Sequence, residues 1–87
     1  MGGIDWETYR RMQQLRRHAR LRRRSEAILK LKRRGYDVKQ LEPIHFRIND
    51  KVDLYPLHNQ WHDLRTGERG AARDLSIWLK EHLKPNE

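Results

Sequence analysis

The chain has 87 residues, no cysteine and a formal net charge of +8. This length fits one domain with a small core, residues 1–87, and the lack of cysteine excludes a disulfide framework and a thiolate zinc site. No apolar run approaches the roughly 20 residues that span a bilayer. The N-terminal residues lack an apolar signal core and the Ser or Thr of a myristoylation motif. We therefore expect a cytoplasmic protein.

The excess positive charge lies in the N-terminal half. Residues 1–42 hold thirteen Lys or Arg and five Asp or Glu, whereas residues 43–87 hold seven of each. This asymmetry predicts a basic helical arm, residues 5–34, attached to a neutral module, residues 36–84. A basic arm is attracted to nucleic acid, anionic lipid or an acidic protein surface, and charge alone does not choose among them.

A long helix is expected first, from an N-cap at Asp5 to the glycine at residue 35. No Pro or Gly interrupts it, and it would be roughly 43 Å long at 1.5 Å per residue. That is long for a small domain, so the helix could break, and Ser25 is the residue best suited to cap a second one. Gly35 in a left-handed conformation would end it, with Tyr36 packing back on Leu31.

The residues that follow predict a small antiparallel sheet. Residues 37–42 fit a short helical turn or a loop. Residues 44–48 and 52–55 alternate apolar and polar, with Asn-Asp between them, which indicates a β-hairpin. Residues 61–64 could form a third strand. The apolar face of this sheet would carry Ile44, Phe46, Ile48, Val52 and Leu54.

A closing amphipathic helix is expected from about Ala71 to just before Pro85, after the glycine-containing loop RTGERG at residues 65–70. We expect this helix to cover the apolar sheet face. The predicted fold class is therefore α+β: a long basic helix, a hairpin or three-stranded sheet, and a helix packed on it. The stripe that faces the core contains Leu75, Trp78, Leu79, His82 and Leu83.

The most unusual stretch is RRHARLRRR, residues 16–24, with six arginines. It overlaps the end of an apolar stripe that begins at Trp6 and ends at Ala19. At about 100° per residue the arginines surround the helix, so a domain this small cannot bury every side of it. The candidate residues for binding a polyanion or an acidic partner are Arg16, Arg17, Arg20, Arg22, Arg23 and Arg24.

The alternative is an ordinary solvated helix or one arm of a helical dimer. Two observations favour a polyanion. Like charges three and four residues apart cost a bare helix about 0.2–0.5 kcal/mol per pair. Arginine outnumbers lysine fourteen to six, and its planar fork suits phosphates and guanine edges. The cluster resembles arginine-rich RNA-binding helices, such as those of phage antiterminators.

The second half offers weaker candidates. Arg65 and Arg69 flank the RTGERG loop, whose glycines could form an anion nest at a helix N-terminus or simply an ordinary turn. The loop does not match a P-loop. Tyr55, on the polar side of its strand, is a candidate for stacking or partner contact, whereas Trp61 and Trp78 are expected in the core.

Histidines were also weighed as metal ligands. His45, His58, His62 and Asp63 could gather around an ion, but their spacing does not match the His-Asn-His pattern of hairpin-helix nucleases. We expect surface histidines, no metal, no cofactor and no enzymatic activity.

Residues 52–79 resemble a pattern of short, uncharacterised phage and prophage proteins. There an aromatic-Pro pair, a Trp, an Asp and a Thr-Gly-x-Arg-Gly segment lead into a final amphipathic helix. The resemblance implies a phage setting more than a function. The matching residues are Tyr55, Pro56, Trp61, Asp63, Thr66, Gly67, Arg69 and Gly70.

The sequence thus predicts a small basic, non-enzymatic protein that binds DNA or RNA through its arginine-rich helix. The alternative is a phage-encoded inhibitor, similar to anti-CRISPR proteins, that binds a host complex handling nucleic acid. A structural or virion-assembly protein is a third possibility. Oligomeric state and the choice between DNA and RNA stay open.

Overall fold

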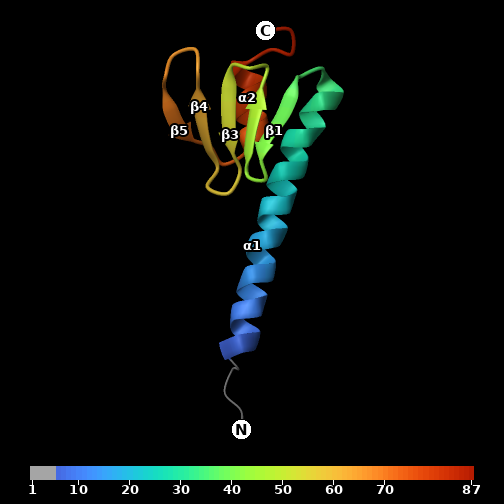
Figure 1. The fold of residues 1–87 in the computed structure, drawn as a ribbon, viewed down its shortest axis with the longest axis vertical. Helices are drawn as coiled ribbons and strands as arrows, with labels where there is room; N and C mark the ends of the chain where they lie inside the picture. Colours follow the sequence, from blue (N-terminus) through green and yellow to red (C-terminus); the bar gives the residue numbers. More distant parts are fainter. Residues whose placement is uncertain (1–5) are drawn as a thin grey trace.

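A computed structural model gives the structure of residues 6–87, excluding the side chains of residues 6, 9, 13 and 14. It has the predicted α+β class, with a long helix, an antiparallel sheet and a closing helix (Figure 1). The sheet has five strands rather than two or three, and its order β1-β2-β3-β4-β5 pairs each strand with its neighbours in sequence. The elements are α1 (Trp6–Leu29), the 3-10 helix η1 (Lys30–Arg34), β1 (Val38–Glu42), β2 (His45–Ile48), β3 (Val52–Tyr55), β4 (Gln60–Asp63), β5 (Arg69–Ala71) and α2 (Leu75–His82).

The N-terminal helix is continuous. α1 passes through Ser25, so the break considered there does not occur. η1 tightens the last turns, and Gly35 ends them with φ 94°. The Gly35 N–H donates to the carbonyl of Lys32 at 3.1 Å, and the Tyr36 N–H donates to that of Leu31 at 3.2 Å. These two bonds form the Schellman ending that the sequence predicts. The expected cap at residue 5 lies outside the described residues.

Strand β1 is the first correction, because the sequence predicts a helical turn or a loop at residues 37–42. Only Val38 of this strand is buried, so it lacks the alternation that marks a half-buried strand. The strand forms because its backbone pairs with β2, which places Val38 opposite Ile48. A bulge between Gln40 and Glu42 interrupts the pairing near its end.

The second correction concerns the RTGERG loop and the start of the last helix. The loop does not lead directly into a helix at Ala71, since its last two residues belong to β5, which pairs antiparallel with β4. α2 begins only at Leu75, and the Asp74 carboxylate accepts hydrogen bonds from two N–H groups of its first turn, at 3.0 and 3.2 Å. A three-residue strand is too short to show a period, so the pattern does not predict it.

Two glycines allow the β4–β5 hairpin. Gly67 has φ 78°, a left-handed conformation that costs glycine little. Gly70 lies opposite Trp61, and a Cβ on it would stand 2.5 Å from Cζ2 of the indole. The indole therefore lies against the bare backbone of β5. It also stacks on Trp78 of α2, with ring centroids 4.3 Å apart.

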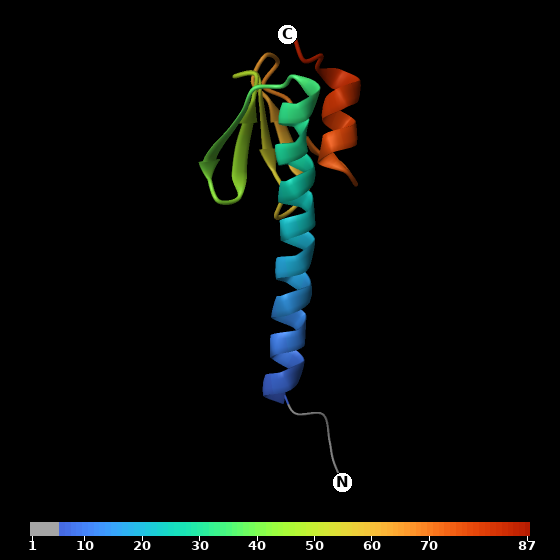
Figure 2. The ribbon, with the colours of Figure 1, turned by 90° about the vertical axis from the view of Figure 1, so that its right-hand side faces the viewer.

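The core lies between one face of the sheet and the two helices. The predicted apolar residues of β2 and β3 are fully buried there, except Ile44, which is half-buried in the turn before β2. Figure 2 shows both helices on the same side of the sheet. Tyr36 joins the ends of the two helical segments, because its hydroxyl donates to the Leu83 carbonyl at 2.6 Å. The helical residues buried in this core are Ile28, Leu31, Leu75, Leu79 and Leu83.

Replacing Gly70 by alanine should lower the free energy of unfolding by about 1–3 kcal/mol, because the added methyl group displaces the Trp61 indole. Ala71→Ser is the matched control, since residue 71 is exposed on the same strand and should change stability by less than about 0.5 kcal/mol. Urea denaturation followed by tryptophan fluorescence measures both. Equal stability of the two variants would contradict the packing of the indole on β5.

Candidate functional site

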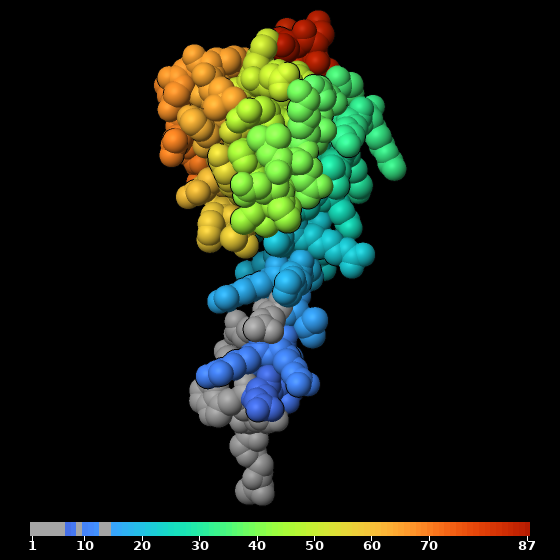
Figure 3. Space-filling model, viewed as in Figure 1, coloured from blue at the N-terminus to red at the C-terminus, as the bar shows by residue number. Residues whose placement is uncertain are grey.

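The N-terminal part of α1 stands away from the domain. The molecule measures 60 × 26 × 21 Å, and its long axis follows this helix (Figure 1). Every described side chain from residue 7 to residue 20 is exposed, and Leu21 is the first to be half-buried. Figure 3 shows this region as a narrow stalk below the domain. We call residues 6–20 the projecting segment; it would be roughly 22 Å long at 1.5 Å per residue.

Five of the six arginines predicted in the cluster are exposed. Arg22 lies 3.3 Å from Glu26, but this pair is open to solvent, where such pairs contribute little. The other four have no ion-pair partner among residues 6–87, so their guanidinium groups are free to bind a ligand. They are Arg16, Arg17, Arg20 and Arg23.

Arg24 has a different role. It is half-buried, and its Nη1 donates to the carbonyls of Pro56 at 3.1 Å and Leu57 at 3.2 Å. These bonds attach α1 to the turn between β3 and β4. The same side chain would leave two carbonyls without their donor if it turned to a phosphate. We therefore assign Arg24 to fixing the helix on the domain.

Two further arginines belong to the exposed surface. Arg10 and Arg11 are exposed on the projecting segment, next to the apolar stripe that the sequence predicts from Trp6 to Ala19. The described side chains Met12 and Leu15 of that stripe meet no core, because they are 49% and 68% exposed. The signal that could have found these arginines is their continuity with the cluster at residues 16–24.

Arg65 is committed to the fold. Its Nε lies 3.1 Å from Asp63 Oδ1 and its Nη2 lies 3.1 Å from Oδ2, and it also donates to the His82 carbonyl at 3.2 Å. The hydrogen bonds from Arg65 hold the pKa of Asp63 below its ordinary value, against the opposing effect of burial. Arg65 thus links the β4–β5 hairpin to the end of α2.

The RTGERG segment is a hairpin turn and does not stand at a helix N-terminus. Within it the Gly67 N–H donates to the Asp63 carbonyl at 2.8 Å, and the Glu68 N–H donates to the Thr66 hydroxyl at 3.2 Å. The donors that an anion nest would offer are therefore partly used by the turn. Of the two arginines predicted here, only Arg69 is free of a carboxylate partner among the described residues.

The sheet has a second face, turned away from both helices (Figure 2). We call it the outer face. Strand pairing aligns one row of its residues across all five strands: Lys39, Arg47, Asp53, His62 and Arg69. A neighbouring row contains Tyr55, Gln60 and Ala71.

Asp53 is buried at the centre of the outer face, with 3% of its surface exposed. Arg47 donates to its two oxygens at 2.8 and 3.1 Å, and His45 Nε2 lies 3.1 Å from Oδ2. Burial alone would raise the pKa of Asp53, but the hydrogen bonds and charge of Arg47, together with the nearby His45 ring, outweigh burial and lower that pKa. Asp53 therefore stays ionised at neutral pH, enclosed by basic groups.

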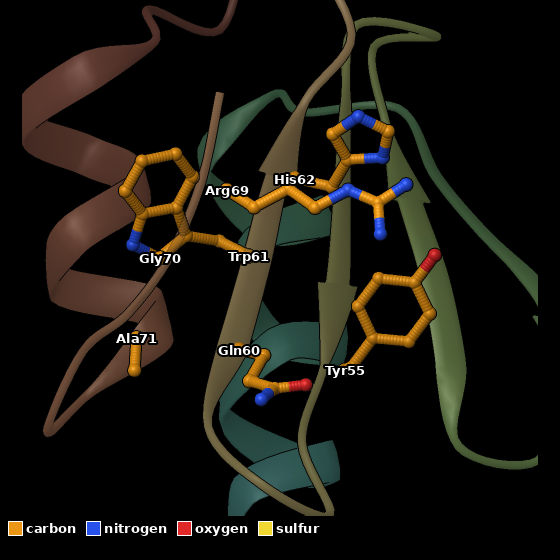
Figure 4. Close-up of a pocket in the computed structure, with 7 residues that line it drawn as sticks. All are labelled: Tyr55, Gln60, Trp61, His62, Arg69, Gly70 and Ala71. Carbon is orange, nitrogen blue, oxygen red and sulfur yellow. The ribbon is translucent and has the colours of Figure 1, made fainter. Parts of the chain in front are cut away.

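A hollow lies on the outer face over β3, β4 and β5. Figure 4 shows the Tyr55 ring, the Gln60 amide and the Arg69 guanidinium around it, with His62 beside Arg69. Tyr55 is half-buried and stacks on His45, with ring centroids 4.6 Å apart. Burial and the nearby Asp53 raise the pKa of the Tyr55 hydroxyl, which is protonated at neutral pH.

The candidate metal ligands do not gather as one group. Within residues 6–87 no group of three or more His, Asp or Glu side chains has a metal-binding arrangement. His58 is exposed in the β3–β4 turn, whereas His62 lies on the outer face. The described helices also include none that is long and apolar enough to cross a membrane.

Comparison with known proteins gives no relative: no protein-family model, curated protein or solved structure matches the chain. The phage resemblance of residues 52–79 therefore stays a prediction. The structure does explain what several residues of that pattern do. Pro56 is fully buried, Trp61 packs on Gly70, and Gly67 turns the hairpin.

The Asp63–Arg65 pair should make the stability of the fold depend on pH in the acidic range. The pKa of Asp63 is lower in the folded state than its ordinary value of 3.8. The ionised carboxylate therefore stabilises the fold fully above about pH 3.8, and this stabilisation is lost as the pH falls through the pKa of the folded state. Between about pH 5 and pH 2 the wild type should therefore lose more stability than Asp63→Asn. Urea titrations across this range measure the difference, and Glu68→Gln, which removes an exposed carboxylate of the same hairpin, is the control. Identical pH profiles for the wild type and Asp63→Asn would contradict this role.

Proposed function

We propose that this protein binds nucleic acid through α1 and is not an enzyme. The observation that carries the proposal is the projecting segment, where exposed arginines surround a helix that leaves the domain. No acidic residue lies between Glu7 and Glu26, so nothing on this part of the helix offsets the arginine charge. A ligand for such a surface has to present negative charge on several sides.

The energetics of the free helix support a polyanionic partner. Arg20 has like charges on four neighbours three or four residues away, namely Arg16, Arg17, Arg23 and Arg24. Each such pair costs a helix about 0.2–0.5 kcal/mol, and exposed side chains gain nothing from the core. Phosphates beside the helix would replace these repulsions by attractions.

The dimensions support a nucleic-acid duplex with an open major groove. An α-helix with side chains is about 10–12 Å across, and the major groove of B-DNA is about 12 Å wide and 8.5 Å deep. Phosphates line both walls of that groove, which suits arginines on all sides of the helix. The major groove of A-form RNA is deep and narrow, so we expect DNA duplexes to bind more tightly than regular RNA duplexes. In this role the protein would act in the cytoplasm of a host cell.

Replacing Arg16, Arg17 and Arg20 by glutamate should abolish binding to a DNA duplex in a gel-shift titration. If about six side chains contact phosphate, wild-type affinity should fall roughly a thousandfold between 50 and 200 mM salt. Three glutamates at Lys30, Lys32 and Arg33 make the matched control, since these residues are exposed on η1 and give the same change of charge.

Retained affinity in the first variant, or equal loss in both, would contradict binding by the projecting segment. A protein partner recovered from host lysate after nuclease treatment, with no affinity for any duplex, would favour the inhibitor alternative.

Arg20→Glu should have opposite effects on the free helix and on binding. It turns the four repulsive pairs into attractive ones, so the helical signal of the free protein should rise in far-ultraviolet circular dichroism. Duplex affinity should fall, because a phosphate contact is lost. The difference in helical signal should shrink at high salt, which screens exposed charges. Arg20→Gln should lie between wild type and Arg20→Glu in both measurements. A lower helical signal for Arg20→Glu than for the wild type would show that repulsion between arginines does not limit the stability of the helix.

A further inference from the structure

The outer face is left uncovered by the fold. Both helices lie on the opposite side of the sheet (Figure 2), so no other element among residues 6–87 packs against the outer face. It is also not uniformly polar, since the half-buried Tyr55 ring lines the hollow beside Gln60 and Arg69 (Figure 4). An aromatic side chain placed in this way offers a flat surface to a ligand.

The Tyr55 ring is held in place before any ligand arrives. Its strand is the central one of five, and His45 stacks on the ring with centroids 4.6 Å apart. A fixed ring loses little conformational freedom on binding, which favours affinity. The stack also uses one side of the ring, so a planar ligand can add to it as the next layer.

The charge around the ring favours an anion. Arg69 is exposed and, within residues 6–87, no carboxylate pairs with it. The charges of Arg69 and Arg47 act to lower the pKa of the Tyr55 hydroxyl, whereas those of Asp53 and Glu42 act to raise it. The one carboxylate at the centre of the face, Asp53, is 3% exposed and bound by Arg47. Its negative charge is therefore shielded from a ligand above the sheet.

We propose that the outer face is a second binding site, which takes an unpaired nucleotide of single-stranded nucleic acid. The base stacks on Tyr55, the Gln60 amide meets its polar edge, and the phosphate binds Arg69. Base stacking on exposed aromatic rings together with basic side chains is the general way in which proteins hold single strands. An acidic peptide would satisfy Arg69 but has no planar group for the ring. This site does not depend on the proposed duplex binding by α1.

The test uses the full-length chain with Arg16, Arg17 and Arg20 changed to glutamine, so that the projecting segment contributes less to binding. Fluorescence anisotropy with a labelled single-stranded DNA of about six nucleotides measures affinity. Tyr55→Ala should weaken binding about tenfold, whereas Tyr55→Phe, which keeps the ring, should bind as the parent does. Arg69→Gln should weaken binding and lower the salt slope by about one contact, roughly 0.7 in log–log units.

Folding and location are checked separately. Arg69 is exposed, so its substitution keeps the test valid if Tyr55→Ala fails to fold. Backbone amide shifts in NMR spectra should move in β3, β4 and β5 on addition of the oligonucleotide. Shifts confined to α1 and η1, or equal affinity of Tyr55→Ala and Tyr55→Phe, would overturn the proposal. Equal competition by polyglutamate of the same charge would do so too, because it would show a site selective for charge alone.

The outcome can be separated from that of the proposed function. Loss of duplex binding in the glutamate variant of the projecting segment would support the α1 proposal and would not test the outer-face site. Loss of single-strand binding in Tyr55→Ala, with duplex affinity unchanged, concerns the outer face alone. No measurable affinity of the glutamine-substituted parent for the single strand would reject the outer-face site and leave the α1 proposal untouched.

Discussion

The whole structure depends on burying one face of one small sheet. Phe46, Ile48, Val52 and Leu54 form that face, and each is fully buried. α2 and the last turns of α1 cover it together, and the bond from Tyr36 to Leu83 joins their ends. The buried apolar residues of both helices pack into this same core, whereas Met12 and Leu15 of α1 are exposed. The remainder of α1 and the outer face of the sheet are consequently left in solvent.

Several charged side chains are paired in the packed module, whereas the arginines at positions 16, 17 and 20 of α1 have no acidic partner among residues 6–87. In the module three acidic residues are used inside the fold: Asp53 is bound by Arg47, Asp63 is bound by Arg65, and Asp74 caps α2. Asp53 and Asp63 thereby offset the charge of Arg47 and Arg65. In the projecting segment no such partners follow Glu7, so the arginine charge faces outward. Folding thus concentrates the available positive charge on the helix, and Arg69 is a separate cation on the sheet that no carboxylate of residues 6–87 pairs with.

Some site residues were predictable and others were not, for identifiable reasons. Arg16, Arg17 and Arg20 stand out because their angular spread around a helix excludes burial, whatever the rest of the chain does. Arg24 belongs to the same pattern, yet its guanidinium reaches the carbonyls of Pro56 and Leu57. Those atoms lie more than thirty residues away, and no local pattern reveals such a contact. Tyr55 was recognisable as a residue on the polar side of its strand, but its stack on His45 and its hollow required the assembled sheet.

The sequence by itself determined the α+β class, the β2–β3 hairpin, the Schellman ending at Gly35 and the leucines of the α2 core stripe, although His82 of that stripe is exposed. Each is encoded by a local period or a single conformational preference, which neighbouring residues display directly. Only the tertiary structure decided that β1 and β5 are strands, since one has a single buried residue and the other has three residues in all. They become strands because β2 and β4 offer backbone hydrogen bonds at their edges. The tertiary structure also decided which arginines are free, because a side chain's partner depends on what folding brings near it.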